Sequence, residues 1–475
     1  MDVIFANPES YHKQVPGRKP VLFCMKSIYN FLSLLIGLTL FLSLSLQGQT
    51  LGEVDRERLD AFFTHLVENN RFMGSVVVMD GNEVVFSEAY GFIDSDRTPA
   101  EPSTIYRIGS ISKTYTAAMI LQLIEQGELG RTTTLDRFYP MIPNAESITI
   151  EHLLRHQSGL VNFTNEPEYM YFYTSQESRE NLIERFVEYG TNFDPGERSE
   201  YSNTGYVLLG YIIEDVTGMH YSEALQEMIN ESLGFTSTRF GSEIRTNQGE
   251  AASFNYTGQW EEALQTYMDI PHGAGAVTAT AGETARFFRA LILGELLSEE
   301  SLIEMARIEN GYGMGLIELT FQNTFGFGHT GGIDGFQSMA GHFPDDDLTF
   351  SILGNALNYS INEITTGLLR ISYDMDFDFP EFEEGSVELA EEDLNKYTGR
   401  FTSGQLPMNI HIFRQNGILM AQATGQSAFP LSATSETVLR FDQAGIIMEF
   451  GELQGGEYQV FLLQQAGVEY RFSRE

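Results

Sequence analysis

This sequence has little cysteine, lysine or positive charge. Cys24 is its one cysteine, so no disulfide can form within the chain. After residue 48, lysine occurs only at Lys113 and Lys396. The 28 basic residues stand against 66 acidic ones, and a chain with a formal net charge of −38 repels nucleic acid and anionic lipid surfaces. We therefore expect no nucleic-acid partner, and the two lysines become candidates for function.

Three catalytic signatures are also absent. The sequence has no H-E-x-x-H zinc motif, no G-x-S-x-G elbow and no glycine-rich loop ending in Lys-Ser or Lys-Thr. These absences argue against a zinc hydrolase, an α/β-hydrolase and a nucleotide-binding enzyme. His152 and His156 stand four residues apart on a predicted helix, a spacing that would allow both to bind one zinc ion. No third ligand is near in sequence. We interpret both histidines as structural and predict no metal site.

A hydrophobic run dominates the N-terminal region. Residues 25–48 contain a charged start, an apolar stretch and a polar exit with small residues, which is the pattern of a secretory signal peptide. Residues 1–24 would then be a disordered or non-native leader. The apolar stretch approaches the ~20 residues that span a bilayer, so an uncleaved anchor is the alternative and the one route to a membrane. We expect export to the periplasm or the extracellular space, and the sequence predicts no oligomeric state.

The apolar periodicity of the following chain predicts an α+β domain over residues 49–373. Two helices and a β-hairpin are expected first, at residues 54–70, 112–126 and 75–86. A mostly helical block follows at residues 134–240. Strand-like segments then return at residues 312–319, 326–330, 337–342 and 348–353. The predicted architecture is an antiparallel sheet with flanking helices, interrupted in sequence by an all-helical insertion.

The C-terminal part of the chain has a different pattern. Residues 374–386 are rich in Asp and Glu and lack periodicity, which predicts an acidic linker. Residues 387–475 contain short alternating segments, expected as strands at residues 408–413, 418–423, 446–450, 458–463 and 468–472. This part is predicted to be a small all-β domain, a barrel or a sandwich.

The segment Gly109-Ser110-Ile111-Ser112-Lys113 places a hydroxyl and an amine three residues apart. On a helix this spacing puts both side chains on one face, about 5 to 6 Å apart. A serine hydroxyl becomes a good nucleophile when a base takes its proton, and a lysine can be that base where its surroundings lower its pKa. S-x-x-K is a common pattern, but after residue 48 it occurs only here. Ser110 and Lys113 are the predicted nucleophile and proton-transfer partner.

Tyr201-Ser202-Asn203 lies between a turn and a helix that is predicted to run to Thr217. The phenol of Tyr201 could relay a proton, and the amide of Asn203 could bind a substrate carbonyl while steadying the lysine. The simpler alternative is a half-buried tyrosine followed by an asparagine that caps the helix.

Gly328-His329-Thr330-Gly331-Gly332 ends a predicted strand. Small residues there allow a substrate backbone to lie along the strand edge. We predict that His329, Thr330 and Gly331 contact substrate, and that the N–H groups of Ser110 and Gly332 form an oxyanion hole. The simpler alternative is a glycine-rich strand end with a histidine that satisfies local hydrogen bonds.

In this order the three elements resemble the active site of serine β-lactamases and penicillin-binding proteins, where S-x-x-K is followed by Y-x-N and a K-T-G strand. The similarity extends to residues 148–160, 274–277 and 312–315, and covers about Leu51 to Tyr373. Through Leu394-Asn395-Lys396-Tyr397-Thr398-Gly399, the tail resembles the lipocalin-like domain attached to many relatives of the class C type.

The resemblance implies acylation of Ser110 by a carbonyl substrate and hydrolysis of the acyl-enzyme by water. Lys113 and Tyr201 would move the protons, which of them is the base stays open, and no metal or organic cofactor is needed. His329 stands where the family usually has a lysine that holds a substrate carboxylate, and a histidine is only partly charged near neutral pH.

We therefore expect a D-amino-acid peptidase or an esterase that acts on small peptide, amide or ester substrates. A true β-lactamase or D-Ala-D-Ala carboxypeptidase is one alternative. A non-catalytic protein that binds cell-wall components or peptides is the other.

Overall fold

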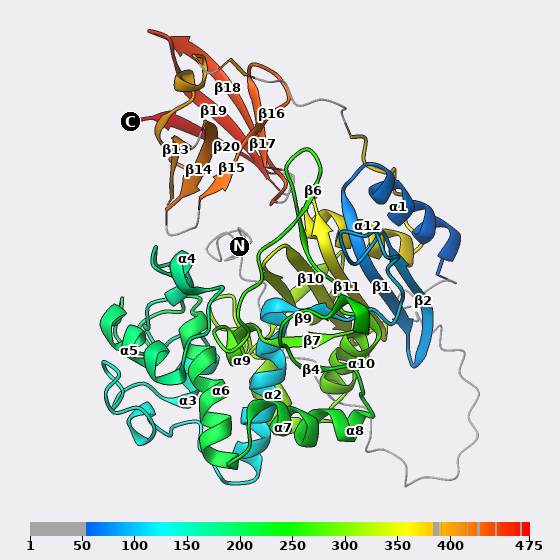
Figure 1. Cartoon of the computed structure of the whole chain (residues 1–475), viewed down its shortest axis with the longest axis vertical. Coiled ribbons are helices and arrows are strands. Elements are labelled where there is room, and N and C mark those ends of the chain that lie inside the picture. The colour runs from blue at the N-terminus through cyan, green and yellow to red at the C-terminus, as the bar shows by residue number, and fades with distance from the viewer. Residues whose placement is uncertain are drawn as a thin grey trace, which may run out of the picture.

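The computed structural model describes residues 54–382, 389–390, 392–406, 408–415, 417–424, 428–441, 444–465 and 468–475. The predicted leader, the predicted signal segment and part of the predicted linker lie outside these residues. In the part of the chain that is described, no helix is both long and apolar enough to cross a bilayer. Figure 1 shows an α+β unit and, above it, a C-terminal body of strands.

An antiparallel sheet forms the centre of the α+β unit, with the order β2-β1-β11-β10-β9-β8. Its strands are β1 (Phe72–Asp80), β2 (Glu83–Tyr90), β8 (Ile317–Phe321), β9 (Thr324–Ile333), β10 (Phe336–Phe343) and β11 (Leu348–Leu357). A short hairpin adds to β11, formed by β5 (Phe254–Tyr256) and β6 (Trp260–Glu262). The prediction of a sheet whose strands are separated in sequence by a helical block is confirmed.

Each face of this sheet is covered by its own helices. Along β1, Val76 and Val78 join the core beneath two helices, whereas Val77 joins the core of the opposite face. The first face carries α1 (Arg56–Glu68) and α12 (Ile361–Ser372), and the second carries α2 (Ser112–Glu125) and α10 (Ala281–Ile292) (Figure 1). Because successive strand residues point to opposite faces, one strand supplies both cores of a helix–sheet–helix arrangement.

Between β2 and β8 the chain is mostly helical, as predicted for residues 134–240. These helices are α3 (Ile150–Leu154), α4 (Tyr169–Phe172), α5 (Arg179–Tyr189), α6 (Asn203–Thr217), α7 (Tyr221–Leu225), α8 (Glu231–Leu233), α9 (His272–Gly275) and α11 (Glu299–Ala306). A small sheet of order β3-β7-β4 crosses the region, built from β3 (Tyr106–Arg107), β7 (Val277–Ala279) and β4 (Arg239–Phe240). Because β3 ends three residues before Ser110, this sheet fixes the approach to the predicted nucleophile.

The C-terminal body is one sheet of nine strands, in the order β15-β14-β13-β12-β20-β19-β18-β17-β16. Its strands are β12 (Gly399–Thr402), β13 (Asn409–Gln415), β14 (Ile418–Ala423), β15 (Phe429–Pro430), β16 (Ser432–Ala433), β17 (Val438–Phe441), β18 (Ile446–Gln454), β19 (Glu457–Gln465) and β20 (Val468–Arg474). Alternate residues such as Met448 and Phe450 fill a separate core. Its two edge strands, β15 and β16, are consecutive in the chain, so the sheet curls into a nearly closed barrel. The predicted all-β tail is confirmed.

The sequence did not predict several of the shortest strands. β3, β4, β7, β15 and β16 have two or three residues each, too few for an alternating pattern to be recognised. The strand expected over residues 312–319 begins only at Ile317. Gly315 interrupts it with φ = +68°, and a Cβ there would lie 2.7 Å from the main-chain oxygen of Lys113. This segment therefore packs against α2 instead of extending the sheet.

His342 on β10 makes the stability of the sheet dependent on pH. Its side chain is fully buried, and its Nδ1 lies 2.9 Å from the hydroxyl of Thr349 on β11. Burial lowers the pKa of His342 to about 4. Since the folded pKa lies below the unfolded value of about 6.5, the neutral ring stabilises the fold fully above pH 6.5. This contribution is lost as the pH falls towards 4.

Between pH 7 and pH 5, the protonation of His342 should lower the free energy of unfolding of the wild type. In His342→Asn we expect this fall to be smaller by about 2 kcal/mol. The Asn side chain keeps a hydrogen-bonding group near Thr349 but cannot titrate. Urea unfolding at the two pH values measures the difference, and His411→Asn, at an exposed position of the barrel, is the matched control. Equal pH dependence in the wild type and in His342→Asn would contradict this assignment.

Candidate active site

Ser110 lies in a single 3-10 turn, Gly109–Ile111, which leads directly into α2. Gly109 has φ = +54°, a left-handed conformation that glycine adopts without the strain of a Cβ. Ser110 lies two residues before Ser112, the first residue of α2. The chain nevertheless brings Lys113 Nζ to 3.0 Å from Ser110 Oγ. The two predicted side chains are in hydrogen-bond contact.

Lys113 is completely buried, and its amine is surrounded by protein oxygen atoms. Besides Ser110 Oγ, Nζ donates to Asn203 Oδ1 at 2.8 Å and to the main-chain oxygen of Ala274 at 2.8 Å. It also lies 4.8 Å from the centroid of the Tyr201 ring. A buried amine is costly unless hydrogen bonds and aromatic faces replace its water. These groups supply that replacement from three separate segments.

Tyr201 and Asn203 reach the same point from the start of α6. The Tyr201 hydroxyl donates to Ser110 Oγ at 2.8 Å. Ser202, not Asn203, occupies the N-cap position of α6, and Asn203 is the first residue of the helix. The alternative in which Asn203 caps the helix is therefore not realised, because its side-chain oxygen accepts from Lys113.

The Gly331-Gly332 end of β9 packs directly against the turn that carries Ser110. A Cβ on Gly331 would overlap the main-chain oxygen of Ile108, and a Cβ on Gly109 would lie 2.6 Å from Gly332 N. The main chains that carry the Ser110 and Gly332 N–H groups are thus in direct contact. Two converging main-chain donors are what an oxyanion hole requires.

A buried ion pair braces this contact. Arg107, three residues before Ser110, lies 2.7 Å from Asp334, two residues after Gly332, and their side chains are 2% and 1% exposed. Asp334 also accepts from the main-chain N–H of Thr266 at 2.9 Å and from its hydroxyl at 2.7 Å. Removal of either charge would leave the other buried and uncompensated. The pair joins the chain before the nucleophile to the hairpin after Gly332.

His329 lies on β9 with 4% of its surface exposed. Its Nδ1 is 2.5 Å from the main-chain oxygen of Thr330, which in the sheet pairs with Met339. A carbonyl can only accept, so Nδ1 carries the hydrogen and Nε2 is an acceptor. Burial, followed by the charge of Lys113, lowers the pKa of His329 to about 4. The ring is therefore neutral near pH 7, whereas the sequence analysis expected partial charge.

His152 and His156 do not share a helix, contrary to the expectation from their spacing. α3 ends at Leu154, and His156 follows it with φ = +57°. The Nδ1 of His152 accepts from the N–H of Thr149 at 3.3 Å, within the capping of α3. His156 instead faces Tyr201, with ring centroids 4.5 Å apart. Among the described residues, no group of three or more His, Cys, Asp or Glu side chains could hold a metal ion.

Three groups that hold the site were not predicted as site residues. The main-chain oxygen of Ala274 accepts from Lys113, and Thr164 Oγ1 accepts from Asn203 Nδ2 at 3.0 Å. Asn162 Oδ1 accepts from the main-chain N–H of Asn203 at 2.9 Å. Hydroxyl, amide and carbonyl groups of these kinds are common throughout any chain. Only the packing of the helices selects these three.

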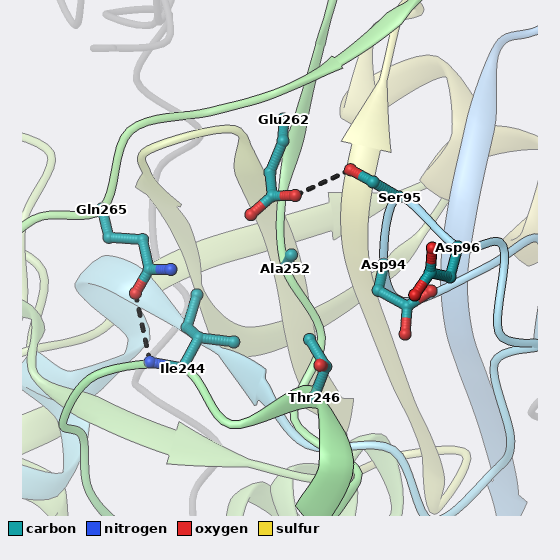
Figure 2. Close-up of a pocket in the computed structure, with 8 residues that line it drawn as sticks. All are labelled: Asp94, Ser95, Asp96, Ile244, Thr246, Ala252, Glu262 and Gln265. Atoms are coloured by element: carbon teal, nitrogen blue, oxygen red, sulfur yellow. Dashed lines mark hydrogen bonds between the residues drawn. The ribbon is translucent and has the colours of Figure 1, made fainter.

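A cavity of about 290 Å³ lies apart from these residues (Figure 2). Its lining is mostly polar and acidic, and consists of Asp94, Ser95, Asp96, Ile244, Thr246, Ala252, Glu262 and Gln265. Inside it, Ser95 donates to Glu262 and Gln265 accepts from the Ile244 N–H. None of the predicted site residues lines this cavity, so the chemistry of Ser110 is not assigned to it.

The fold and the contacts of Ser110 define a class, the serine hydrolases of the β-lactamase and penicillin-binding-protein fold. The family model described as Beta-lactamase matches residues 59–365, about two thirds of the chain, and the chain belongs to this family. Penicillin-binding protein 4* of Bacillus subtilis is 27% identical to this chain, in an alignment that covers 87% of this chain and 97% of that protein.

Two solved structures share the fold. The D-amino acid amidase from Ochrobactrum anthropi SV3, complexed with L-phenylalanine amide, is 22% identical with a TM-score of 0.59, over 67% of this chain and 98% of its own. The octameric penicillin-binding protein homologue from Pyrococcus abyssi is 22% identical with a TM-score of 0.60, over 88% of this chain and 99% of its own. The resemblance stated from the three motifs is confirmed.

Gly331→Ala tests the contact between β9 and the Ser110 turn. The added methyl group meets the main-chain oxygen of Ile108, which cannot move without displacing the turn. We expect the free energy of unfolding to fall by about 1–3 kcal/mol. In Gly282→Ala, the matched control on α10, the methyl group meets nothing within 4 Å and should change stability by less than about 1 kcal/mol. Urea unfolding measures both, and equal stability of Gly331→Ala and wild type would contradict the contact.

Proposed function

We propose that this protein is a serine hydrolase that forms an acyl-enzyme at Ser110 and cleaves amide, peptide or ester bonds of small substrates. One observation carries the proposal. Ser110 Oγ is contacted both by Lys113 Nζ at 3.0 Å and by the Tyr201 hydroxyl at 2.8 Å. A serine in contact with two proton-transfer groups can be deprotonated as it attacks. Membership of the β-lactamase family supports the same class of reaction.

In the acylation step, Ser110 Oγ bonds to the substrate carbonyl carbon, and the hydroxyl proton passes to the neutral amine of Lys113 or to the phenolate of Tyr201. The substrate oxygen, now negative, accepts hydrogen bonds from the N–H groups of Ser110 and Gly332. The C–N or C–O bond then breaks, and the leaving group takes a proton from the same Lys113 and Tyr201 pair. The acyl group stays on Ser110.

In the deacylation step, water adds to the acyl carbon and gives a proton to this pair. The bond to Oγ breaks, Oγ regains its proton, and the acid product leaves. Asn203 and the Ala274 carbonyl hold the Lys113 amine through both steps, since both are hydrogen-bonded to Nζ at 2.8 Å.

A fluorophosphonate probe should add one label per chain to the wild type and none to Ser110→Ala, because alanine has no nucleophilic oxygen. Ser112→Ala is the matched control from the same motif. It should keep the label, because the Ser112 hydroxyl accepts from the Val277 N–H at 3.0 Å and is not the proposed nucleophile. Intact mass measures the label. A label that persists in Ser110→Ala would contradict the proposal, and saturable ligand binding by an unlabelled wild type would favour the non-catalytic alternative.

The neutral state of His329 supports a substrate class. Its Nε2 is an acceptor, so the site offers an amide N–H, a hydroxyl or an ammonium a partner at this position. A substrate carboxylate finds no permanent cation from His329, unlike the lysine of a K-T-G strand. We therefore favour an amidase or peptidase of the D-amino-acid type, or an esterase, over a β-lactamase or a D-Ala-D-Ala carboxypeptidase. The names of the amidase and penicillin-binding relatives support the amide and peptide classes.

His329→Lys should shift the preference of the enzyme towards substrates with a carboxylate on the leaving side, by about tenfold or more in kcat/KM, because one charged hydrogen bond is worth at least 1.5 kcal/mol. Wild-type kcat/KM should not follow His329 between pH 6 and 8, since its pKa is about 4. Paired substrates that differ only in the carboxylate measure the shift, with His329→Gln as the neutral control. An unchanged ratio in His329→Lys would remove this role.

Export is the remaining part of the proposal. The charged start, the apolar stretch and the polar exit of residues 25–48 support secretion or, if this segment is not cleaved, anchoring to a membrane. The proposed substrates, small peptides, amides or esters, are compatible with either location.

A further inference from the structure

Tyr201 stands in a main-chain segment that one residue, His156, holds on both sides. The main-chain oxygen of His156 accepts from the Glu200 N–H at 2.8 Å. The Nδ1 of the same residue accepts from the Ser202 N–H at 3.2 Å. Both residues that flank Tyr201 are therefore tied to His156, and its imidazole lies against the Tyr201 ring with centroids 4.5 Å apart.

The backbone of His156 makes this double contact, because its left-handed conformation, φ = +57°, lets both its carbonyl and its ring meet the 200–202 segment. Apart from glycine, histidine is with asparagine and aspartate among the residues that adopt this conformation most readily. Its side chain is 3% exposed. Burial, followed by the charge of Lys113, lowers the pKa of His156 well below its usual range. The ring is therefore neutral and can accept at Nδ1.

From this geometry we propose that His156 is a positioning residue for Tyr201, which aims the phenol at Ser110 Oγ without touching substrate. The inference rests on the proposed serine hydrolase function and adds a residue to it. A phenol oxygen lies several ångströms from its own main chain, so a small rotation of the segment displaces it. A misplacement of roughly 1 Å in a reacting group costs about a hundredfold in rate.

A matched pair of variants tests the double contact of His156, through its ring acceptor and its left-handed backbone together. Asn and Leu have the same branched shape, but only Asn keeps an acceptor for the Ser202 N–H and tolerates a left-handed backbone. We expect His156→Leu to lower kcat about 30- to 100-fold with KM changed less than about threefold. His156→Asn should stay within about fivefold of the wild type. End-point fluorophosphonate labelling counts the competent sites, so that a misfolded fraction does not enter kcat.

A double-mutant cycle with Tyr201→Phe then separates positioning from general support of the fold. If His156 acts through the phenol, the double variant His156→Leu with Tyr201→Phe should be as slow as Tyr201→Phe alone, within about threefold. Multiplied losses, or equal kcat values for His156→Leu and His156→Asn, would overturn the proposal. If His156→Leu does not fold, His156→Ala also lacks the acceptor and enters the same cycle. Absence of any label on the wild type would instead overturn the proposed function.

Discussion

The site depends on one constraint, the burial of the Lys113 amine. A buried amine must receive acceptors from the protein, and Nζ finds them in three segments that are far apart in sequence. The turn before α2 provides Ser110, the start of α6 provides Asn203, and α9 provides the carbonyl of Ala274. These helices can approach only because small residues meet between them. A Cβ on Gly273 would lie 2.9 Å from the Cα of Gly210 on α6.

Burial, followed by the charge of the same lysine, keeps the neighbouring histidines neutral. Its charge adds to burial in lowering the pKa of both His329 and His156. Both rings are consequently neutral, and each presents an acceptor, His329 at Nε2 and His156 at Nδ1. In a chain with a formal net charge of −38, Lys113 thus brings a basic group to Ser110 while the histidines around it remain uncharged.

The site is assembled from two parts of the α+β unit. The helical block supplies Tyr201 and Asn203, and the sheet supplies the Gly331-Gly332 end of β9. The Ser110 turn lies between them. The buried pair of Arg107 and Asp334 ties the sheet hairpin to the chain that leads into this turn. The groups proposed for proton transfer and those proposed for oxyanion binding are therefore held by separate contacts.

Local spacing along the sequence was enough to predict much of the fold and part of the site. The interval between Ser110 and Lys113 predicted their contact and the alternation along β1 predicted the layered sheet, because contacts within one helical turn or one strand follow from the geometry of the backbone. The order of the three motifs predicted the family. The separate β-rich tail was equally evident from its short alternating segments and turns.

Only the tertiary structure decided the rest. Tyr201 and Ser110 are 91 positions apart, and Arg107 and Asp334 are 227 apart, so no local pattern links them. The neutral state of His329 and the turn of His156 towards Tyr201 depend on burial, which packing determines and composition does not. The residue types of the site are therefore a property of the sequence. The charges and orientations of these side chains depend on the fold, because both are determined where segments distant in sequence pack together and exclude water.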